Sequence, residues 1–275
     1  MATPTPFDFE YLPSLSIENT DEIFESWNAR SAATQAGLLP QTDIRYGTHP
    51  REVMDYYRAP QARGCVVFIH GGYWLGFSKF ETSFVADGFV GQGLSVVMPS
   101  YPLCPDVKIA DIRQSCAKAF AHLYWHVLGP AEREAIVVSG HSAGGYLAAT
   151  CMLEDWATRA LPENPVKGVV SLSGVFDVSP LIETSLNAKL KLDEAQAKSL
   201  NLIASRPRNK ADLILAVGER ESSEFHRQST DLGQSWATLS PRLVDVPAAN
   251  HFTIVDSLAT EGGFLNRLAV ALAGR

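Results

Sequence analysis

The feature that most constrains the fold of this chain is a five-residue turn between a short apolar run and a helix-like run. Residues 140–144 read G-H-S-A-G; strand-like residues 135–139 precede them and helix-like residues 146–153 follow. A serine on such a turn adopts a strained backbone that exposes its hydroxyl, and flanking glycines leave room for neighbouring backbone. The N–H of Ala143, at a helix N-terminus, can stabilise an oxyanion. Ser142 is therefore predicted to be a nucleophile, and a glycine-rich turn with an incidental serine is the alternative.

The segment after another buried strand adds a second constraint. Residues 65–69 form a continuous apolar run with β-branched side chains, which predicts a strand buried on both faces, and residues 70–74 follow directly as H-G-G-Y-W. In serine hydrolases with such a serine turn, backbone at this position binds the carbonyl oxygen of the substrate. The N–H groups of Gly72 and Tyr73 are therefore predicted oxyanion donors. His70, like the histidine of the serine turn, is predicted to be structural, because the general base comes late in the chain.

A histidine near the C-terminus is the predicted general base. His251 follows the strand-like residues 243–246 and precedes the helix-like residues 253–258. Between Ser142 and His251, residues 211–217 predict another buried strand. The acid of a catalytic triad is expected at the end of such a strand.

Four acidic residues are candidates for this acid. Glu219, Glu221 and Glu224 lie on the loop after the strand or at the start of the next helix, and Asp245 lies on the strand before the histidine. We favour Glu221, because a side chain beyond a tight turn at Gly218 can fold back toward the base. A solvated loop in which these glutamates pair with arginines is the competing interpretation.

Together these motifs resemble one known family. Residues 70–74, 140–145 (G-H-S-A-G-G) and 250–252 (N-H-F) are similar to the kynurenine formamidase (arylformamidase) group of α/β-hydrolases, close to the hormone-sensitive-lipase-like carboxylesterases. The similarity covers most of the chain. Residues 218–225 resemble the acid loop of the family, which points to Glu221, although the family more often carries aspartate there. Serine, acid and histidine also follow the chain order of α/β-hydrolases.

The rest of the chain alternates predicted strands and helices. This alternation builds a mostly parallel central sheet with helices on both faces, as the α/β-hydrolase fold requires. Residues 42–46 and 53–57 are expected to form an antiparallel starting pair. Helices are expected over residues 80–92 and about 109–127.

Two segments are candidates for a lid on a single domain that spans residues 1–275. Residues 180–208 interrupt the alternation and predict a small helical cap, with an ordinary pair of surface helices equally compatible. Residues 21–36 carry an apolar stripe that would form a second part of a lid or, more simply, dock on the body.

Composition bounds the class of protein. The 275 residues, 46% of them hydrophobic, suffice for a large core, and the net charge of −7 with scattered basic residues argues against nucleic acid as a partner. No apolar run approaches the roughly 18 residues that cross a bilayer, and the first residues lack signal-peptide features. We therefore expect a cytoplasmic protein that does not bind membranes. Four cysteines without zinc or redox spacing are expected to be reduced.

The predicted reaction is acyl transfer. Ser142 attacks, His251 takes its proton, Glu221 orients the imidazole, and the oxyanion is bound by N–H groups. Neither a metal nor an organic cofactor is expected. Four aromatic residues near the motifs are predicted to wall a pocket for an aryl amide or aryl ester, with core packing as the alternative for each: Tyr73, Trp74, Tyr101 and Phe252.

The resemblance implies an arylformamidase. A small-substrate carboxylesterase and a carbamate hydrolase use the same machinery and are the alternatives, and a non-catalytic binding protein on this fold is less favoured. The expected partner is a small-molecule substrate, and a homodimer is left open.

Overall fold

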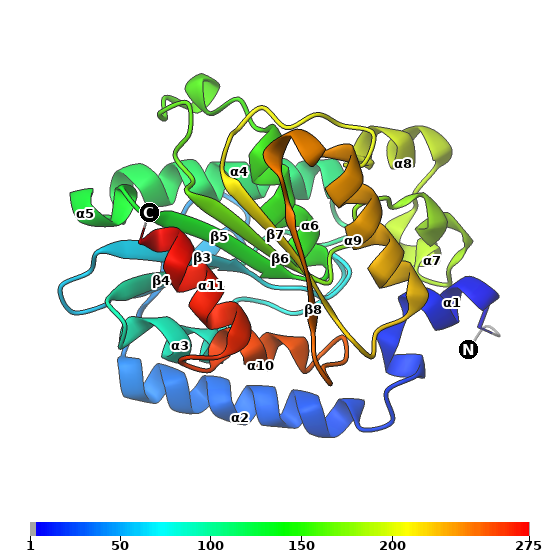
Figure 1. Ribbon diagram of the computed structural model, residues 1–275, viewed down its shortest axis with the longest axis horizontal. Coiled ribbons are helices and arrows are strands. Elements are labelled where there is room, and N and C mark those ends of the chain that lie inside the picture. Colours follow the sequence, from blue (N-terminus) through cyan, green and yellow to red (C-terminus); the bar gives the residue numbers. More distant parts are fainter. Residues whose placement is uncertain (1–3, 275) are drawn as a thin grey trace.

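A computed structural model describes residues 4–274, and its centre is one eight-stranded sheet (Figure 1). The strand order is β1-β2-β4-β3-β5-β6-β7-β8. The first two strands join the sheet antiparallel, and β4, β3 and β5 to β8 run parallel to one another, as predicted. The strands are β1 (Gln41–Arg45), β2 (Val53–Tyr57), β3 (Gly64–Ile69), β4 (Leu94–Pro99), β5 (Ile136–His141), β6 (Gly168–Leu172), β7 (Asp212–Gly218) and β8 (Arg242–Val246).

Helices cover both faces of this sheet. One face carries α4, α6 and α9, and the other carries α2, α3, α10 and α11 (Figure 1). The helices are α1 (Pro6–Tyr11), α2 (Thr20–Leu38), α3 (Asp87–Val90), α4 (Ile109–His126), α5 (Pro130–Arg133), α6 (Ala143–Thr150), α7 (Asn187–Leu190), α8 (Glu194–Leu200), α9 (Ser223–Ser235), α10 (Ile254–Ala259) and α11 (Phe264–Ala273). In the described part of the chain, none of them combines the length and apolar content needed to cross a membrane.

The two faces of the sheet bury two separate cores. Along β3, Cys65 and Val67 belong to the core under α4 and α6, whereas Val66 and Phe68 belong to the core under α2 and α10. Because successive side chains of a strand point to opposite faces, a strand buried on both faces is apolar at every position. This explains the continuous apolar runs in the sequence.

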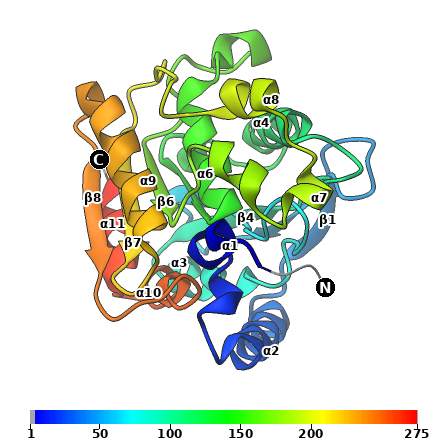
Figure 2. The same ribbon diagram turned by 90° about the vertical axis from the view of Figure 1, so that its right-hand side faces the viewer.

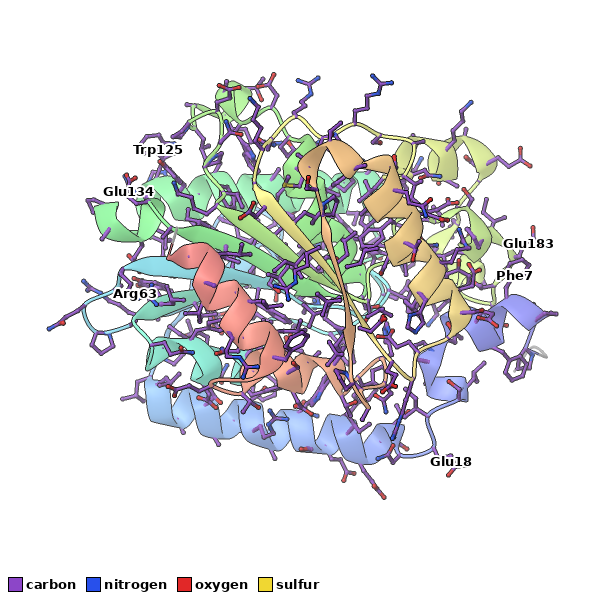
Figure 3. The ribbon with its side chains drawn as sticks, viewed as in Figure 1. Phe7, Glu18, Arg63, Trp125, Glu134 and Glu183 are labelled. Carbon is purple, nitrogen blue, oxygen red and sulfur yellow. The ribbon has the colours of Figure 1, made fainter. Side chains whose placement is uncertain are left out.

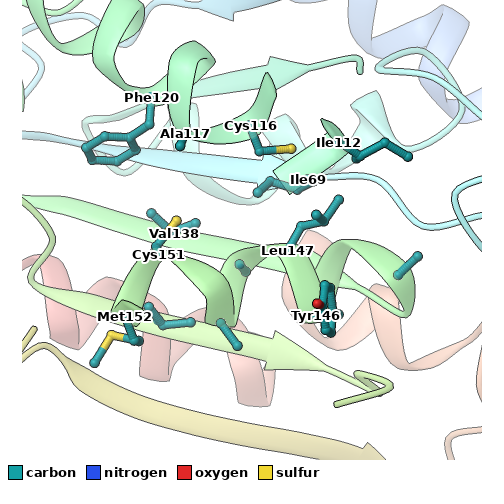
Figure 4. Packing of buried hydrophobic residues seen from close by; sticks show 14 of the residues in the cluster. Ile69, Ile112, Cys116, Ala117, Phe120, Val138, Tyr146, Leu147, Cys151 and Met152 are labelled. Carbon is teal, nitrogen blue, oxygen red and sulfur yellow. The ribbon is translucent and has the colours of Figure 1, made fainter. Parts of the chain in front are cut away.

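Packing between α4, the sheet and α6 is shown in Figure 4. Cys116 and Phe120 of α4 lie on one side of the β3 and β5 strands, near Val138, and Leu147 of α6 belongs to the same core. Helix α6 is short, and all of its residues are buried. The serine turn at its N-terminus is therefore held in the middle of the molecule.

One segment differs from the element expected, and the insertion at 180–208 has the helical elements expected of it. Residues 80–92 were expected to be one helix, but they form a 3₁₀ turn (Ser83–Ala86) followed by the four-residue α3. Glycine is unfavourable inside helices, and this stretch has one within α3, at 88, and two between α3 and β4, at 91 and 93. Residues 180–208 form a 3₁₀ turn (Ser179–Glu183), α7 and α8.

Strands β3, β5, β6, β7 and β8 all end on the same side of the sheet. In open α/β sheets, ligands bind outside the carboxyl ends of the strands. Figure 2 shows α1, from the N-terminal segment, in front of the sheet on this side. The three sequence motifs follow β3, β5 and β8, so the fold brings them to this edge.

Candidate active site

Ser142 occupies a sharp turn between β5 and α6. Its backbone has φ 55° and ψ −120°, a strained conformation for a residue with a side chain, and its N–H donates a 2.8 Å hydrogen bond to the carbonyl of Leu172. The turn is pressed against the end of β3: a Cβ added at Gly144 would lie 2.0 Å from the carbonyl oxygen of Ile69. The glycine is therefore required by close backbone approach.

This close approach predicts that Gly144→Ala destabilises the protein. The alanine Cβ would overlap backbone that cannot move without shifting β3, so we expect the free energy of unfolding to fall by about 1–3 kcal/mol or more. Urea unfolding monitored by fluorescence measures the change. Gly37→Ala in α2 is the matched control, because nothing lies within 4 Å of an added Cβ there. Equal stability of both variants would contradict the packing described.

His251 and Glu221 form a buried hydrogen-bonded pair. The imidazole Nδ1 lies 2.6 Å from Oε2 of Glu221, and the two side chains are 4% and 0% exposed. The other carboxylate oxygen, Oε1, accepts from the N–H of Gly218 and the hydroxyl of Ser173, both at 2.6 Å. Donors on both oxygens fix the carboxylate in one orientation. The carboxylate in turn holds the imidazole in one orientation, in which Nε2 is the ring nitrogen not bonded to Glu221.

The other three candidate acids contact groups other than His251. Oε2 of Glu219 accepts from the N–H of Ala248 at 2.7 Å. A hydrogen bond from Arg227 lowers the pKa of Glu224, and the two side chains form a 2.7 Å ion pair. Asp245 is 71% exposed and faces His226. Of the four acids considered, Glu221 is the one that the fold brings to His251.

His141 supports the backbone of His251. Its Nε2 donates to the carbonyl oxygen of His251 at 2.6 Å, and burial lowers the pKa of His141 well below its ordinary value. A neutral imidazole has one N–H, and here that N–H is used by the carbonyl. On the other side of the His251 ring, Phe225 packs with a centroid distance of 4.4 Å. His141 thus has the structural role predicted for it.

Ser142 and His251 line the same cavity. Among the described residues, no hydrogen bond joins the Ser142 hydroxyl to the imidazole. In unliganded enzymes such bonds are often long and shorten when substrate binds. The arrangement therefore has the parts of a triad, with the serine–histidine contact open.

The loop after β3 folds beside Ser142. A Cβ added at Gly71 would lie 3.2 Å from the Cβ of Ser142, so the loop backbone runs directly past the serine. Gly72, Tyr73 and Trp74 all have positive φ, at 97°, 50° and 58°. Within residues 4–274, the N–H groups of Gly72, Tyr73 and Ala143 donate to no protein acceptor. These are the three donors predicted for an oxyanion.

The buried side chains of His70 and Tyr101 pack beside this loop and hold it in place. The two rings stack at 4.2 Å with an angle of 7°, and the Tyr101 hydroxyl donates to the carbonyl of His70 at 2.8 Å. Burial lowers the pKa of His70 to about 3, so its ring is a neutral hydrogen-bonding group next to the Gly71 carbonyl. His70 ties the loop, as predicted.

Two of the four residues predicted to wall the pocket do not line it. Tyr101 is fully buried beneath the loop, where its ring and hydroxyl support His70. Trp74 is also fully buried, because the reversal of the backbone at 72–74 directs its ring into the core against Tyr146. Aromatic character near a motif does not reveal which way a side chain points.

The cavity beside Ser142 has a volume of about 340 Å³. Of the predicted pocket residues, Tyr73 and Phe252 line it. Sequence reasoning did not assign seven further side chains to it. Two of them directly follow the H-G-G-Y-W loop, and the others come from segments without a catalytic motif: Leu75 and Phe77, then Leu12, Pro13, Ser14, Phe24 and Leu186. Two signals were available: Phe24 lies in the apolar stripe of α2, and Leu186 lies in the segment expected to form a cap.

The N-terminal segment around α1 is fastened over this site. The Tyr73 hydroxyl donates to the carbonyl of Tyr11, and the Ser222 hydroxyl donates to the carbonyl of Glu10 at 2.6 Å. On the other side, the Thr5 hydroxyl donates to the carbonyl of Glu183 at 3.0 Å. Phe7 and Glu183 accordingly lie at the same end of the molecule (Figure 3). The segment thus connects the loop after β3, the acid loop and residues 180–208.

Within residues 4–274, no group of three or more His, Cys, Asp and Glu side chains is arranged to hold a metal ion.

Comparisons with known proteins agree with this geometry. The sequence profile of the alpha/beta hydrolase fold matches residues 66–246, and the chain belongs to this family. Within the family it is similar to kynurenine formamidases: the protein from Salmo salar is 30% identical over 90% of this chain and 87% of its own, and the protein from Danio rerio is 30% identical over the same shares.

A solved structure is similar over nearly the whole chain. It is a candidate thioesterase from a Silicibacter species, with a TM-score of 0.87 and 30% identity, covering 98% of this chain and 100% of its own. The protein is therefore a serine hydrolase that acts on small acyl groups, which confirms the class of reaction predicted from the sequence.

Proposed function

We propose that the protein is arylformamidase-like and removes a small, formyl-like acyl group from an aryl amide or aryl ester. The cavity carries this proposal: beside Ser142 and His251, the rings of Phe24, Phe77 and Phe252 make an aromatic wall. Phe24 meets Phe77 and Phe252 edge-on, at centroid distances of 5.3 Å and 4.9 Å. A flat aryl group gains buried area and ring contacts against such a wall.

The proposed mechanism uses the residues in the following roles. His251 removes the proton of the Ser142 hydroxyl as its oxygen attacks the carbonyl carbon, and Glu221 orients and stabilises the imidazolium. The N–H groups of Gly72, Tyr73 and Ala143 bind the oxyanion of the tetrahedral intermediate. His251 then gives its proton to the leaving amine or alcohol. Water, deprotonated by the same imidazole, releases the acid and restores the serine.

Two further assignments belong to this proposal. Residues 180–208 act as a cap, supported by Leu186, which lines the cavity. The enzyme works in the cytoplasm, supported by four cysteines that are all buried and free: Cys65, Cys104, Cys116 and Cys151.

Substrate preference tests the proposal. We expect kcat/KM for an N-formyl aryl amine to exceed that for a matched alkyl formamide by about fivefold or more, because one well-placed ring contributes about 1 kcal/mol. Acetyl aryl esters should be cleaved faster than octanoyl esters if the acyl side of the site is shaped for a formyl-like group, as proposed. Preference for the alkyl amide or the octanoyl ester would leave a general esterase or lipase instead.

Parallel rates separate the related activities. An aryl ester, an aryl carbamate and, because of the solved neighbour, an aryl thioester are measured beside the aryl formamide. Covalent labelling by a fluorophosphonate distinguishes an enzyme from a binding protein on the same fold. If the reagent did not label the protein, the proposed mechanism would be wrong.

A further inference from the structure

The wall of the cavity is assembled from apolar side chains of four separate segments. Leu12 and Pro13 come from the N-terminal segment, Phe24 from α2, Leu186 from the segment between β6 and β7, and Phe252 from the loop after β8. Each segment presents carbon atoms to the same space. The surroundings of a bound leaving group are therefore apolar on several sides.

The titratable side chains that line the cavity each have a partner within the protein. Nε2 of His141 is bound to the carbonyl of His251, and burial keeps the pKa of His141 low, so its ring is neutral. The Tyr73 hydroxyl donates to the carbonyl of Tyr11, and burial raises the pKa of Tyr73 well above its ordinary value. His251 is held by Glu221. Among the described residues that line the cavity, none is Asp, Glu, Lys or Arg.

Charged side chains near the site line a second cleft. These are Glu10, Arg220 and Glu221, the partner of His251; the cleft shares Pro13 and His251 with the main cavity but has a volume of only about 20 Å³. That space suffices for about one water molecule. The Glu10 carboxylate accepts from the hydroxyl of Ser223 at 3.0 Å. A charged group in the main cavity therefore has no ionic partner there.

We propose that this enzyme selects uncharged aryl substrates. A carboxylate or an ammonium that enters an apolar cavity loses hydration without gaining a partner, and this loss lowers its affinity. An aryl formamide with an amino-acid side chain, as in kynurenine, bears both charges. The inference rests on the proposed function, because it concerns the leaving group of the same acyl transfer, and it separates this chain from an enzyme for amino-acid substrates.

Matched esters test the inference on the wild-type protein. A phenyl acetate that carries a carboxymethyl group is compared with its methyl ester, and each kcat/KM is divided by the hydroxide-catalysed rate of the same compound to remove differences in leaving-group reactivity. A third acetate with a trimethylammonium group tests cations. We expect the neutral compound to be favoured by at least about tenfold over each charged one.

A variant with a new charge in the cavity wall provides the second test. Leu186→Arg places a guanidinium at the cavity, so the normalised ratio of carboxylate ester to neutral ester should rise by about fivefold or more. Leu39→Arg is the matched control: it adds the same charge at a side chain that is 80% exposed and does not line the cavity, and its ratio should equal that of the wild type.

The outcomes are distinct. Equal normalised rates on neutral and charged esters in the wild type, or equal ratios in the two arginine variants, would overturn the inference while the proposed function stands. If neither the aryl acetates nor the N-formyl aryl amine were hydrolysed, the proposed function would fail, and the inference with it.

Discussion

Replacing Ser142 with alanine is expected to lower kcat by on the order of a millionfold, to a rate close to background. The hydroxyl oxygen forms the covalent bond of the acyl-enzyme, so the substitution removes the attacking atom itself. Among the described residues, Ser142 makes hydrogen bonds through its backbone N–H and carbonyl, to Leu172 and Tyr146, and none through its hydroxyl. The variant should therefore unfold at nearly the same urea concentration as the wild type.

Ser139→Ala is the control for this substitution. Ser139 lies on β5, three residues before Ser142, and is also buried, but its hydroxyl donates to the carbonyl of Val170 at 2.8 Å and does not line the cavity. We expect kcat to stay within a few-fold of the wild type, with a loss of stability of about 1 kcal/mol. Substantial turnover by purified Ser142→Ala protein would rule out the acyl-enzyme mechanism.

The second large effect is expected at Glu221. In Glu221→Gln, the side-chain amide presents one oxygen and one NH₂ to a site with donors on both sides: His251 on one, Gly218 and Ser173 on the other. Either the imidazole takes the wrong tautomer or two donors face each other, and the charge that stabilises the imidazolium is lost in both cases. We expect kcat to fall by on the order of a thousandfold or more, with KM changed little.

Glu219→Gln is the matched comparison. Its carboxylate accepts from the N–H of Ala248, and a glutamine oxygen can do the same. Steady-state kinetics on both variants should therefore show a large loss at 221 and almost none at 219. The reverse ranking would assign the acid to Glu219, and wild-type rates in both variants would remove each of them from the mechanism.

The sequence determined the elements that depend on short stretches of chain. The serine turn, the H-G-G-Y-W loop and His251 could each be predicted because the demand is local: a glycine where backbones touch, an apolar run where a strand is buried on both faces. Chain order then placed the three motifs on one fold. The same local reasoning favoured Glu221 on the grounds of the turn at Gly218, and at that turn a Cβ would indeed lie 2.6 Å from the carbonyl of Ala249.

Only the tertiary structure decided which side chains meet. Glu221 contacts an imidazole 30 residues later in the chain, and no spacing rule distinguishes it from Glu219 or Asp245. Trp74 and Tyr101 turned inward because their direction follows from packing against the core.

The cavity wall shows the same limit most clearly. Leu12 and Leu186 look like ordinary apolar residues in the sequence, and they line one cavity because hydrogen bonds from Thr5 and Tyr73 fasten the N-terminal segment over the strand ends. Short-range patterns determine elements and turns, whereas the surface offered to a substrate is formed by contacts between segments that are far apart in the chain.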